Sequence, residues 1–246
     1  MKTVTAFILF IFPFTLFGQT LMKETDELIN KDDPGWPIVQ LWIDSAKNKV
    51  EILPRDSTAA KIALYKTQVT TRSPMGSIIY QTGGLLIDNG WIRILGSGSL
   101  RLNRSLPDWN KGKSFNDFGE RPSFLLIADD AIGGYFAINA GFLAKENIGK
   151  VYYLSPDNLE WEFLDLNYSE FLLFCFNGNL NAFYEKLRWQ NWKEDVAQLT
   201  GDKVYFFYPF LWTKEGKDIS KVSRKIISIE EHYSISIETR KQLGIE

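Results

Sequence analysis

The side chains of this chain that could carry out acid–base chemistry are carboxylates near the ends of apolar runs, namely Asp88, Asp108, Glu120, Asp129 and Asp130. Two carboxylates held roughly 5 to 9 Å apart suit the hydrolysis of a glycosidic bond. The region of Asp88, Asp129 and Asp130 is therefore the candidate site of a carboxylate-dependent hydrolase. Aspartate is also common in turns at strand ends, where its side chain bonds to the nearby backbone. The turn interpretation is favoured, and hydrolysis remains an alternative.

Chemistry based on nitrogen or sulfur is limited, because the 246 residues contain one histidine and one cysteine. A closed zinc site needs more ligands of these types, so we expect no metal and no cofactor. A Ser-His-Asp triad would have to use His232, which lies in the charged run 230–233 and is predicted to be solvated on a helix. Cys175 lies among the aromatic residues of 171–176, which predicts a buried and unreactive thiol.

Arginine and tryptophan gather around residues 91–93 and in the polar segment 97–122. These two residue types dominate the energetic hot spots of protein interfaces. The side chains that we expect to contact a partner are Arg93, Arg101, Arg104, Trp109, Asp129 and Asp130. Trp91 opens an apolar run and is predicted to lie in the core. For the loop residues, the alternative is that they are solvated surface side chains.

The composition describes a chain with ample material for a packed core, since 45% of the residues are hydrophobic and 15% are aromatic. The length fits one large folded unit. Lysine and arginine total 28 against 30 acidic residues, which gives a formal net charge of −2. Such a balance lacks the basic surface of a nucleic-acid-binding protein or of one that binds anionic membranes. We therefore expect no nucleic-acid partner.

The first residues have the three-part pattern of a secretory signal peptide. Lys2 supplies the positive start, residues 4–17 are almost wholly apolar, and Gly18 is a small residue before a polar chain. The apolar segment is shorter than the roughly 20 residues that span a bilayer. We expect residues 1–19 to be removed and residues 20–246 to be exported to the periplasm or secreted, with no stable membrane anchor. An uncleaved N-terminal anchor is the alternative.

The strand pattern is clearest around Asn89-Gly90, which two apolar runs flank. This dipeptide is the strongest short-range hairpin signal, because both central positions of a type I′ turn need φ > 0. Further strands are predicted from the apolar runs at 124–128, 135–139, 151–154 and 161–164. Tight turns between them predict a mainly antiparallel sheet of about five or six strands. With helices before and after the sheet, the fold class is α+β.

Helix starts are predicted from capping residues at Asp33-Pro34, Asp56 and Ser73-Pro74. Later helices are predicted from Ser169, over 180–189, over 192–199 and over 229–243. An extended aromatic segment is predicted at 204–208. Residues 97–122 and 214–225 are polar and rich in turn residues, which predicts surface loops.

Three blocks of sequence together resemble the SUKH superfamily and, more closely, an uncharacterised bacterial domain-of-unknown-function family (2625) near it. Each block is weak alone, and their order is the more specific feature. The first block is 83–98 followed by Leu-Pro-Asp-Trp-Asn at 106–110. The second is 124–130 followed by the glycine-marked return strand 133–139. The third is 151–154, then Trp161 and Ser-Glu-Phe-Leu at 169–172.

The resemblance implies an α+β domain with a mostly antiparallel sheet and a cleft used for protein partners. It implies no catalytic residues. Many relatives are regarded as immunity proteins that neutralise toxins, mostly in the cytoplasm, so an export signal departs from that pattern. The segment beyond Trp189 is expected to lie outside the shared core as a C-terminal helical extension.

The function that we expect from these observations is an exported, non-enzymatic protein-interaction module. An envelope protein that binds a small ligand or glycan is the alternative, because eight tryptophans supply stacking surface. The carboxylate-dependent hydrolase is third.

Overall fold

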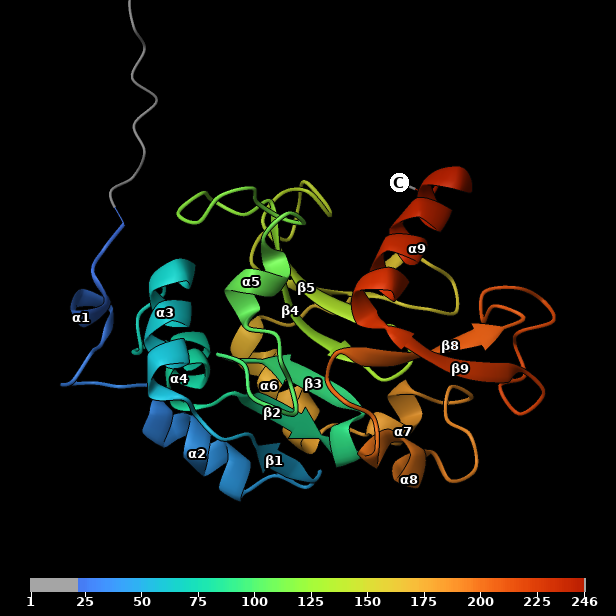
Figure 1. Cartoon of the computed structure of the whole chain (residues 1–246), viewed down its shortest axis with the longest axis horizontal. Helices are drawn as coiled ribbons and strands as arrows, with labels where there is room; N and C mark the ends of the chain where they lie inside the picture. Colours follow the sequence, from blue (N-terminus) through green and yellow to red (C-terminus); the bar gives the residue numbers. More distant parts are fainter. Residues whose placement is uncertain (1–21, 246) are drawn as a thin grey trace, which may run out of the picture.

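Seven strands that follow one another along the chain form the main sheet, and each is antiparallel to its neighbours (Figure 1). The computed structural model describes residues 22–245, so the predicted signal peptide, residues 1–19, lies outside the described residues. The strands are β1 (Val50–Ile52), β2 (Gly84–Ile87), β3 (Ile92–Leu95), β4 (Phe124–Asp130), β5 (Tyr135–Asn139), β6 (Val151–Leu154) and β7 (Trp161–Phe163). The predicted α+β class and antiparallel sheet are confirmed.

The predicted strand number of about five or six is wrong, because the sheet has seven strands. The edge strand β7 corresponds to the strand predicted at 161–164. The seventh strand is the other edge, β1, which has three residues and belongs to the sheet through its pairing with β2.

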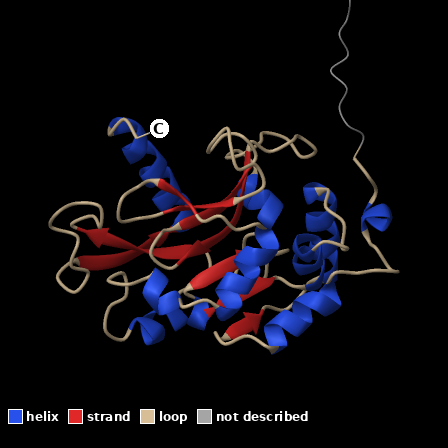
Figure 2. Cartoon of the chain, turned by 180° about the vertical axis from the view of Figure 1, so that it is seen from behind, coloured by secondary structure: helices blue, strands red, loops and turns tan. Residues whose placement is uncertain are grey.

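The helices before the main body of the sheet are α1 (Thr25–Leu28), α2 (Trp36–Asp44), α3 (Ser57–Thr67) and α4 (Pro74–Gln81). α3 and α4 begin where their capping residues predict. The start predicted for α2 at Asp33-Pro34 is wrong, because its N-cap is Gly35 and its first residue is Trp36. The Asp56 side chain accepts a hydrogen bond from the N–H of Ala59, and the Ser73 hydroxyl accepts one from the N–H of Gly76. α2, α3 and α4 lie together at one side of the molecule, away from the C-terminal strands (Figure 1, Figure 2).

The hairpin predicted at Asn89-Gly90 joins β2 to β3. Asn89 and Gly90 have positive φ values of 63° and 91°, as predicted. The connection covers residues 88–91 and is longer than a two-residue turn, because Asp88 also has a positive φ and Trp91 has helical φ and ψ values. This longer connection places the Trp91 side chain in the core, where it is fully buried.

The chain after β7 folds into helices and a second sheet of two strands. These elements are α6 (Tyr168–Asn177), α7 (Leu180–Phe183), α8 (Trp192–Ala197), β8 (Lys203–Tyr208), β9 (Ser223–Ser228) and α9 (Ile229–Gln242). The predicted loop 214–225 contains the start of β9, which carries exposed Arg224 and Lys225 and so lacks an apolar strand pattern. The predicted helix 180–189 is mostly absent, and its backbone is left-handed at Lys186.

The short helix α5 (Leu106–Asn110) lies inside the segment 97–122, which was predicted to be a surface loop, and is largely buried.

The C-terminal segment is joined to the rest of the chain. In β8, the Tyr205 N–H donates a hydrogen bond of 2.9 Å to the Ala131 carbonyl beside β4. Buried residues from both halves of the chain form one hydrophobic cluster. Within residues 22–245, none of the helices combines the length and apolar character needed to cross a bilayer.

Candidate functional site

Two arginines and one aspartate from different segments form a buried ion-pair network beside the main sheet. Asp129 of β4 is fully buried, and its two carboxylate oxygens accept hydrogen bonds from Arg93 Nε at 2.6 Å and Arg104 Nη1 at 2.7 Å. Arg93 also donates to the Lys203 carbonyl at 2.5 Å, and Arg104 donates to the Gly201 carbonyl at 2.6 Å. The network therefore joins β3, β4 and the loop before α5 to the C-terminal segment.

Asp130 points to the other side of β4, because neighbouring side chains of a strand alternate between its faces. Its fully buried carboxylate accepts hydrogen bonds from the hydroxyls of Tyr153 at 2.7 Å and Tyr184 at 3.1 Å, and from the Gly134 N–H at 2.8 Å. Burial raises the pKa of Asp130, and these hydrogen bonds oppose that rise. The Asp130 side chain therefore contacts only groups inside the fold.

Three of the side chains predicted to contact a partner are therefore corrected. Arg93 is 2% exposed, and Asp129 and Asp130 are 0% exposed. A side chain without exposed surface does not touch a second protein. The charge pattern that suggested an interface in the sequence is an internal network in the structure.

The other three predicted contact residues lie in two places. Arg101 is about half exposed and pairs with Glu51 on the edge strand β1. Trp109 is 4% exposed, and its ring contacts the cationic groups of Arg104 at 4.5 Å and Lys113 at 4.1 Å. Arg104 and Trp109 thus come together, whereas Arg101 does not join them.

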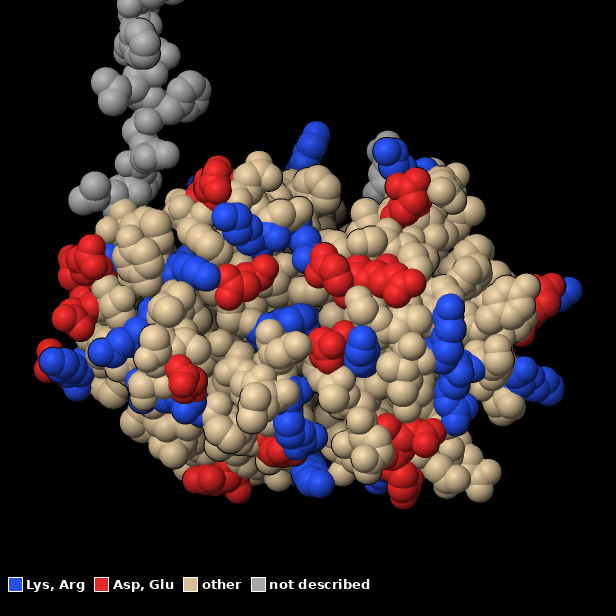
Figure 3. All heavy atoms as spheres, in the orientation of Figure 1, with Lys and Arg blue, Asp and Glu red and all other residues tan. Residues whose placement is uncertain are grey.

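A cleft of about 300 Å³ opens between Arg104 and Trp109 on one side and the start of α9 on the other. The three acids at this cleft are paired within the chain. Asp108 binds Lys66 at 2.6 Å, Glu230 binds Lys113 at 2.9 Å, and Asp202 lies 3.8 Å from Lys203. Acidic and basic side chains are interspersed over the face shown in Figure 3. The cleft therefore presents no strong field of one sign to a partner.

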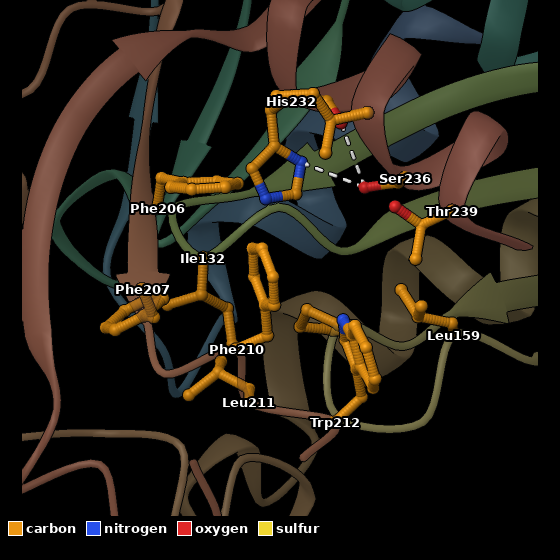
Figure 4. A pocket seen from close by; sticks show the side chains of 12 residues that line it. Ile132, Leu159, Phe206, Phe207, Phe210, Leu211, Trp212, His232, Ser236 and Thr239 are labelled. Atoms are coloured by element: carbon orange, nitrogen blue, oxygen red, sulfur yellow. Dashed lines mark hydrogen bonds between the residues drawn. The ribbon is translucent and has the colours of Figure 1, made fainter.

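A second hollow, which we call the aromatic pit, lies between β8, the loop after β8 and α9 (Figure 4). One wall consists of Phe206, Phe207, Phe210, Leu211 and Trp212. The opposite wall is one face of α9 and consists of His232, Ile235, Ser236 and Thr239. Residues at these spacings share one side of a helix. The floor consists of Ile132, Pro156 and Leu159.

The aromatic wall is held by ring-to-ring contacts and continues outside the pit. The rings of Phe210 and Trp212 stack with their centroids 5.4 Å apart, and Phe206 meets Phe210 edge to face at 5.4 Å. Tyr208 lies 6.3 Å from Phe210 and is 68% exposed. We call Tyr208, Phe210 and Trp212 the aromatic rim.

His232 is the one ionisable side chain among the pit-lining residues and is 7% exposed, so the prediction that it is solvated is wrong. Its Nδ1 atom lies 3.0 Å from the Tyr135 hydroxyl and 3.3 Å from the Ser236 hydroxyl. Its Nε2 atom points into the pit and has no hydrogen-bond partner among the described residues (Figure 4). Burial, together with the charge of Arg93, lowers the pKa of His232 to about 4, so the ring is neutral at pH 7.

The volume of the pit limits what it can hold. Pockets for drug-sized ligands and cofactors measure about 300 to 1,000 Å³. The pit measures about 30 Å³, which is on the order of two water molecules. It therefore fits the tip of a side chain or a similarly small group, while the rest of the molecule that carries this group lies on the rim.

The acids considered for hydrolysis do not converge. Asp88 binds Arg188 at 2.7 Å, Asp129 binds two arginines, and Asp130 lies on the opposite side of β4. None of the three lines the cleft or the pit. The part of the chain that the structure describes also contains no group of three or more side chains arranged to hold a metal ion.

The sequence reasoning missed the pit because its walls lie far apart in the chain. The sequence predicted an extended aromatic segment only at 204–208, and it predicted the polar residues of α9 to lie on the surface of a helix. A signal was present in the spacing of His232, Ser236 and Thr239, which places all three on one helix face. Only their position opposite the aromatic run turns that face into a pit wall.

Comparison with known proteins identifies relatives across nearly the whole chain. An uncharacterized protein of Haemophilus influenzae is 43% identical over 224 residues, which cover 91% of this chain and 98% of the relative. The putative uncharacterized protein YbfG of Escherichia coli is 44% identical over 220 residues, which cover 89% of this chain and 98% of the relative.

The family match is equally broad. The model of the family described as "Protein of unknown function DUF2625" matches residues 25–232. This range includes β8, β9 and the start of α9, so the family match extends beyond Trp189. The chain therefore belongs to the DUF2625 family of bacterial proteins of unknown function.

Proposed function

We propose that this chain is an exported, non-enzymatic protein-interaction module that docks its partner at the aromatic pit and rim. The observation that carries the proposal is the small pit between the aromatic wall and α9, with the exposed Tyr208 beside it. Protein interfaces concentrate their energy where an anchor side chain fills a pocket surrounded by aromatic residues. A pit of about 30 Å³ accepts such an anchor and is too small for a cofactor.

Export is the second part of the proposal. It is supported by the positive start, the apolar segment 4–17 and the small residue Gly18. The family match begins at residue 25, after this segment. In the producing bacterium, we expect the protein in the periplasmic or secreted fraction, with a new N-terminus close to residue 20. Protein that is found in the cytoplasm with residues 1–19 still attached would contradict export.

The docking surface is tested by site-specific photo-crosslinking. A photoreactive phenylalanine analogue replaces Tyr208 on the rim or, as a matched control, Phe142, which is 70% exposed and lies outside the pit lining. We expect a discrete crosslinked protein at position 208 in the cell envelope, and its loss when Thr239→Leu fills the pit mouth. Crosslinking that is stronger at position 142, or unaffected by Thr239→Leu, counts against this docking surface.

A relation to the SUKH superfamily is a finer part of the proposal. Its support is the order of the sequence blocks, in which antiparallel strands are followed by the Ser-Glu-Phe-Leu segment at the start of α6. An experimental structure of this chain, superposed on SUKH proteins, tests the relation. A different strand order in those proteins would reject it.

Envelope glycan binding is the second candidate function. The observation that favours it is the polar face of α9 opposite aromatic rings, since sugars combine hydroxyl groups with a face that stacks on aromatic side chains. Differential scanning fluorimetry with a panel of sugars and peptidoglycan fragments tests it. A rise in melting temperature with one of them would place this function first.

A further inference from the structure

We propose that the aromatic pit receives a neutral hydrogen-bonding group, the amide or hydroxyl tip of a side chain of the partner protein, and that this group binds Nε2 of His232. The inference deepens the proposed function and rests on it for the partner's being a protein. It adds the chemical class of the anchor and the atom that recognises it.

The first argument is the free nitrogen of the imidazole ring. Both hydrogen-bond contacts of the ring, to Tyr135 and to Ser236, are made by Nδ1. Nε2 points into the space between Phe206, Phe210 and Ile132 (Figure 4), and no described residue satisfies it. Nε2 faces an open pit and is not a buried, unsatisfied atom, so water reaches it in the free protein. A group that displaces this water must itself form a hydrogen bond with Nε2, because a desolvated imidazole nitrogen without a partner costs free energy.

The second argument is that the ring is already held in place. Tyr135 lies 3.0 Å from Nδ1, and the Ser236 hydroxyl donates to the His232 carbonyl at 2.9 Å. Gly133 packs so closely below the ring that a Cβ atom there would overlap it. A ring fixed in this way needs no ordering when a partner binds, which favours recognition by Nε2.

The third argument concerns the number of donors and acceptors on the anchor. If Tyr135 donates to Nδ1, Nε2 carries the proton and donates into the pit. If Nδ1 donates instead, Nε2 is an acceptor. A primary amide and a hydroxyl each contain a donor and an acceptor, so they match Nε2 in either tautomer. A carboxylate only accepts and an ammonium group only donates.

The fourth argument is charge. The 12 side chains that line the pit include no aspartate, glutamate, lysine or arginine. A charged tip would lose its hydration without meeting an opposite charge. A neutral tip with few atoms suits both the lining and the volume of about 30 Å³. Asparagine, glutamine, serine and threonine supply such tips. The mutual stacking of Phe210 and Trp212 occupies one face of each ring, which leaves less surface for a sugar.

The experiment uses His232 as a built-in probe, because it is the one histidine of the chain. Untagged full-length protein is labelled with ¹⁵N, and the imidazole nitrogens are followed by two-dimensional NMR. The small molecules added are acetamide and isopropanol as side-chain mimics, acetate and methylammonium as charged counterparts, and N-acetylglucosamine as a sugar. Ligands with so few atoms are expected to bind with dissociation constants of roughly 10 to 100 mM.

We expect acetamide and isopropanol to shift the Nε2 resonance saturably, and the two charged molecules to leave it unchanged. Thr239→Leu, at the pit, should abolish the shift. Ser234→Leu, an exposed position on the same helix that does not line the pit, should retain it. Both variants report their folding through the same spectrum.

Three results would overturn the inference: no shift with either neutral mimic in the folded protein, an equal shift with acetate, or a shift at lower concentration with N-acetylglucosamine than with the mimics. The proposed function is judged separately by crosslinking at Tyr208. If the neutral mimics bind but no crosslink forms at position 208, the protein-docking role is rejected and the proposed chemistry of the pit is retained. Crosslinking without an Nε2 shift rejects the chemistry alone.

Discussion

Asp129 is held by charged partners, because each of its oxygens binds a different arginine in a site without solvent access. Removing one partner from a buried ion pair leaves an uncompensated charge, which is strongly destabilising. An exposed pair contributes little, since water screens both charges. Asp129 and Arg101 were predicted to belong to the same interface, but their substitutions should differ in their effect on the free energy of unfolding.

Asp129→Asn should lower the free energy of unfolding by about 3 to 5 kcal/mol, because two guanidinium groups stay buried without their carboxylate. Arg101→Ala, which removes only the pair with Glu51, should change it by less than about 1 kcal/mol. Urea denaturation followed by circular dichroism measures both. Similar losses in the two variants would show that the Asp129 network does not stabilise the fold.

His232 should make stability depend on pH in a defined window. Its pKa is about 4 in the folded protein, whereas a fully solvated histidine has a pKa of 6.5, so the unfolded chain binds more protons between these values. The stabilisation is therefore complete above pH 6.5 and is lost as the pH falls through 4. For a shift of this size, the loss is roughly 3 kcal/mol.

The comparison that isolates this effect is His232→Gln, which removes the titrating group. Burial raises the pKa of Asp130, which favours the folded state at low pH and so acts in the opposite direction. The prediction concerns the difference between the two proteins in urea denaturation from pH 7 to pH 4. If both lose stability in parallel over this range, the ring does not have the depressed pKa.

At the scale of the elements, the turn between β4 and β5 and the helix α9 depend on each other. Gly133 has a φ of 86° and lies against the His232 ring of α9. A left-handed backbone costs a residue with a side chain about 1 to 2 kcal/mol. At Gly133 the overlap with the ring adds to this cost.

The matched control is Gly149, which has a φ of 82° and open space around its missing side chain. Gly149→Ala should therefore cost about 1 to 2 kcal/mol. Gly133→Ala should cost more and should also move the imidazole signals of His232. Equal effects on melting temperature and an unchanged imidazole spectrum would mean that the turn does not position the ring.

At the scale of the whole molecule, the C-terminal segment is part of the core and not an appendage. Trp91 packs against Trp189 and Trp192 at centroid distances of 5.8 and 4.9 Å, and Tyr135 contacts Tyr233 at 5.0 Å. The carbonyls of Gly201 and Lys203 complete the arginine network.

A chain that ends at Trp189 should therefore lose its cooperative unfolding transition, because it exposes the Tyr135 side chain and leaves both buried arginines short of acceptors. A chain that ends at Gln242, the last residue of α9, should keep it. Circular dichroism during urea denaturation distinguishes the two. A cooperative transition in the shorter chain would show that the extension is dispensable.

Much of this architecture could be predicted from the sequence, because it depends on interactions within a few residues of one another. Asp56 and Ser73 mark helix starts through their own backbone neighbours, and Asn89-Gly90 marks a hairpin through its own φ values. The alternation of apolar runs and turns indicated an antiparallel sheet in an α+β fold. β9 escaped prediction because pairing with β8, not an apolar pattern, makes it a strand.

The candidate site, in contrast, could not be predicted from the sequence. Residue types pointed to Arg93, Asp129 and Asp130, yet burial depends on what packs over a side chain, and the covering groups come from far along the chain. His232 and Phe206 face each other because α9 folds back over β8. Local patterning therefore predicts many of the elements, whereas which polar groups face inward and which stay exposed depends on contacts between distant segments.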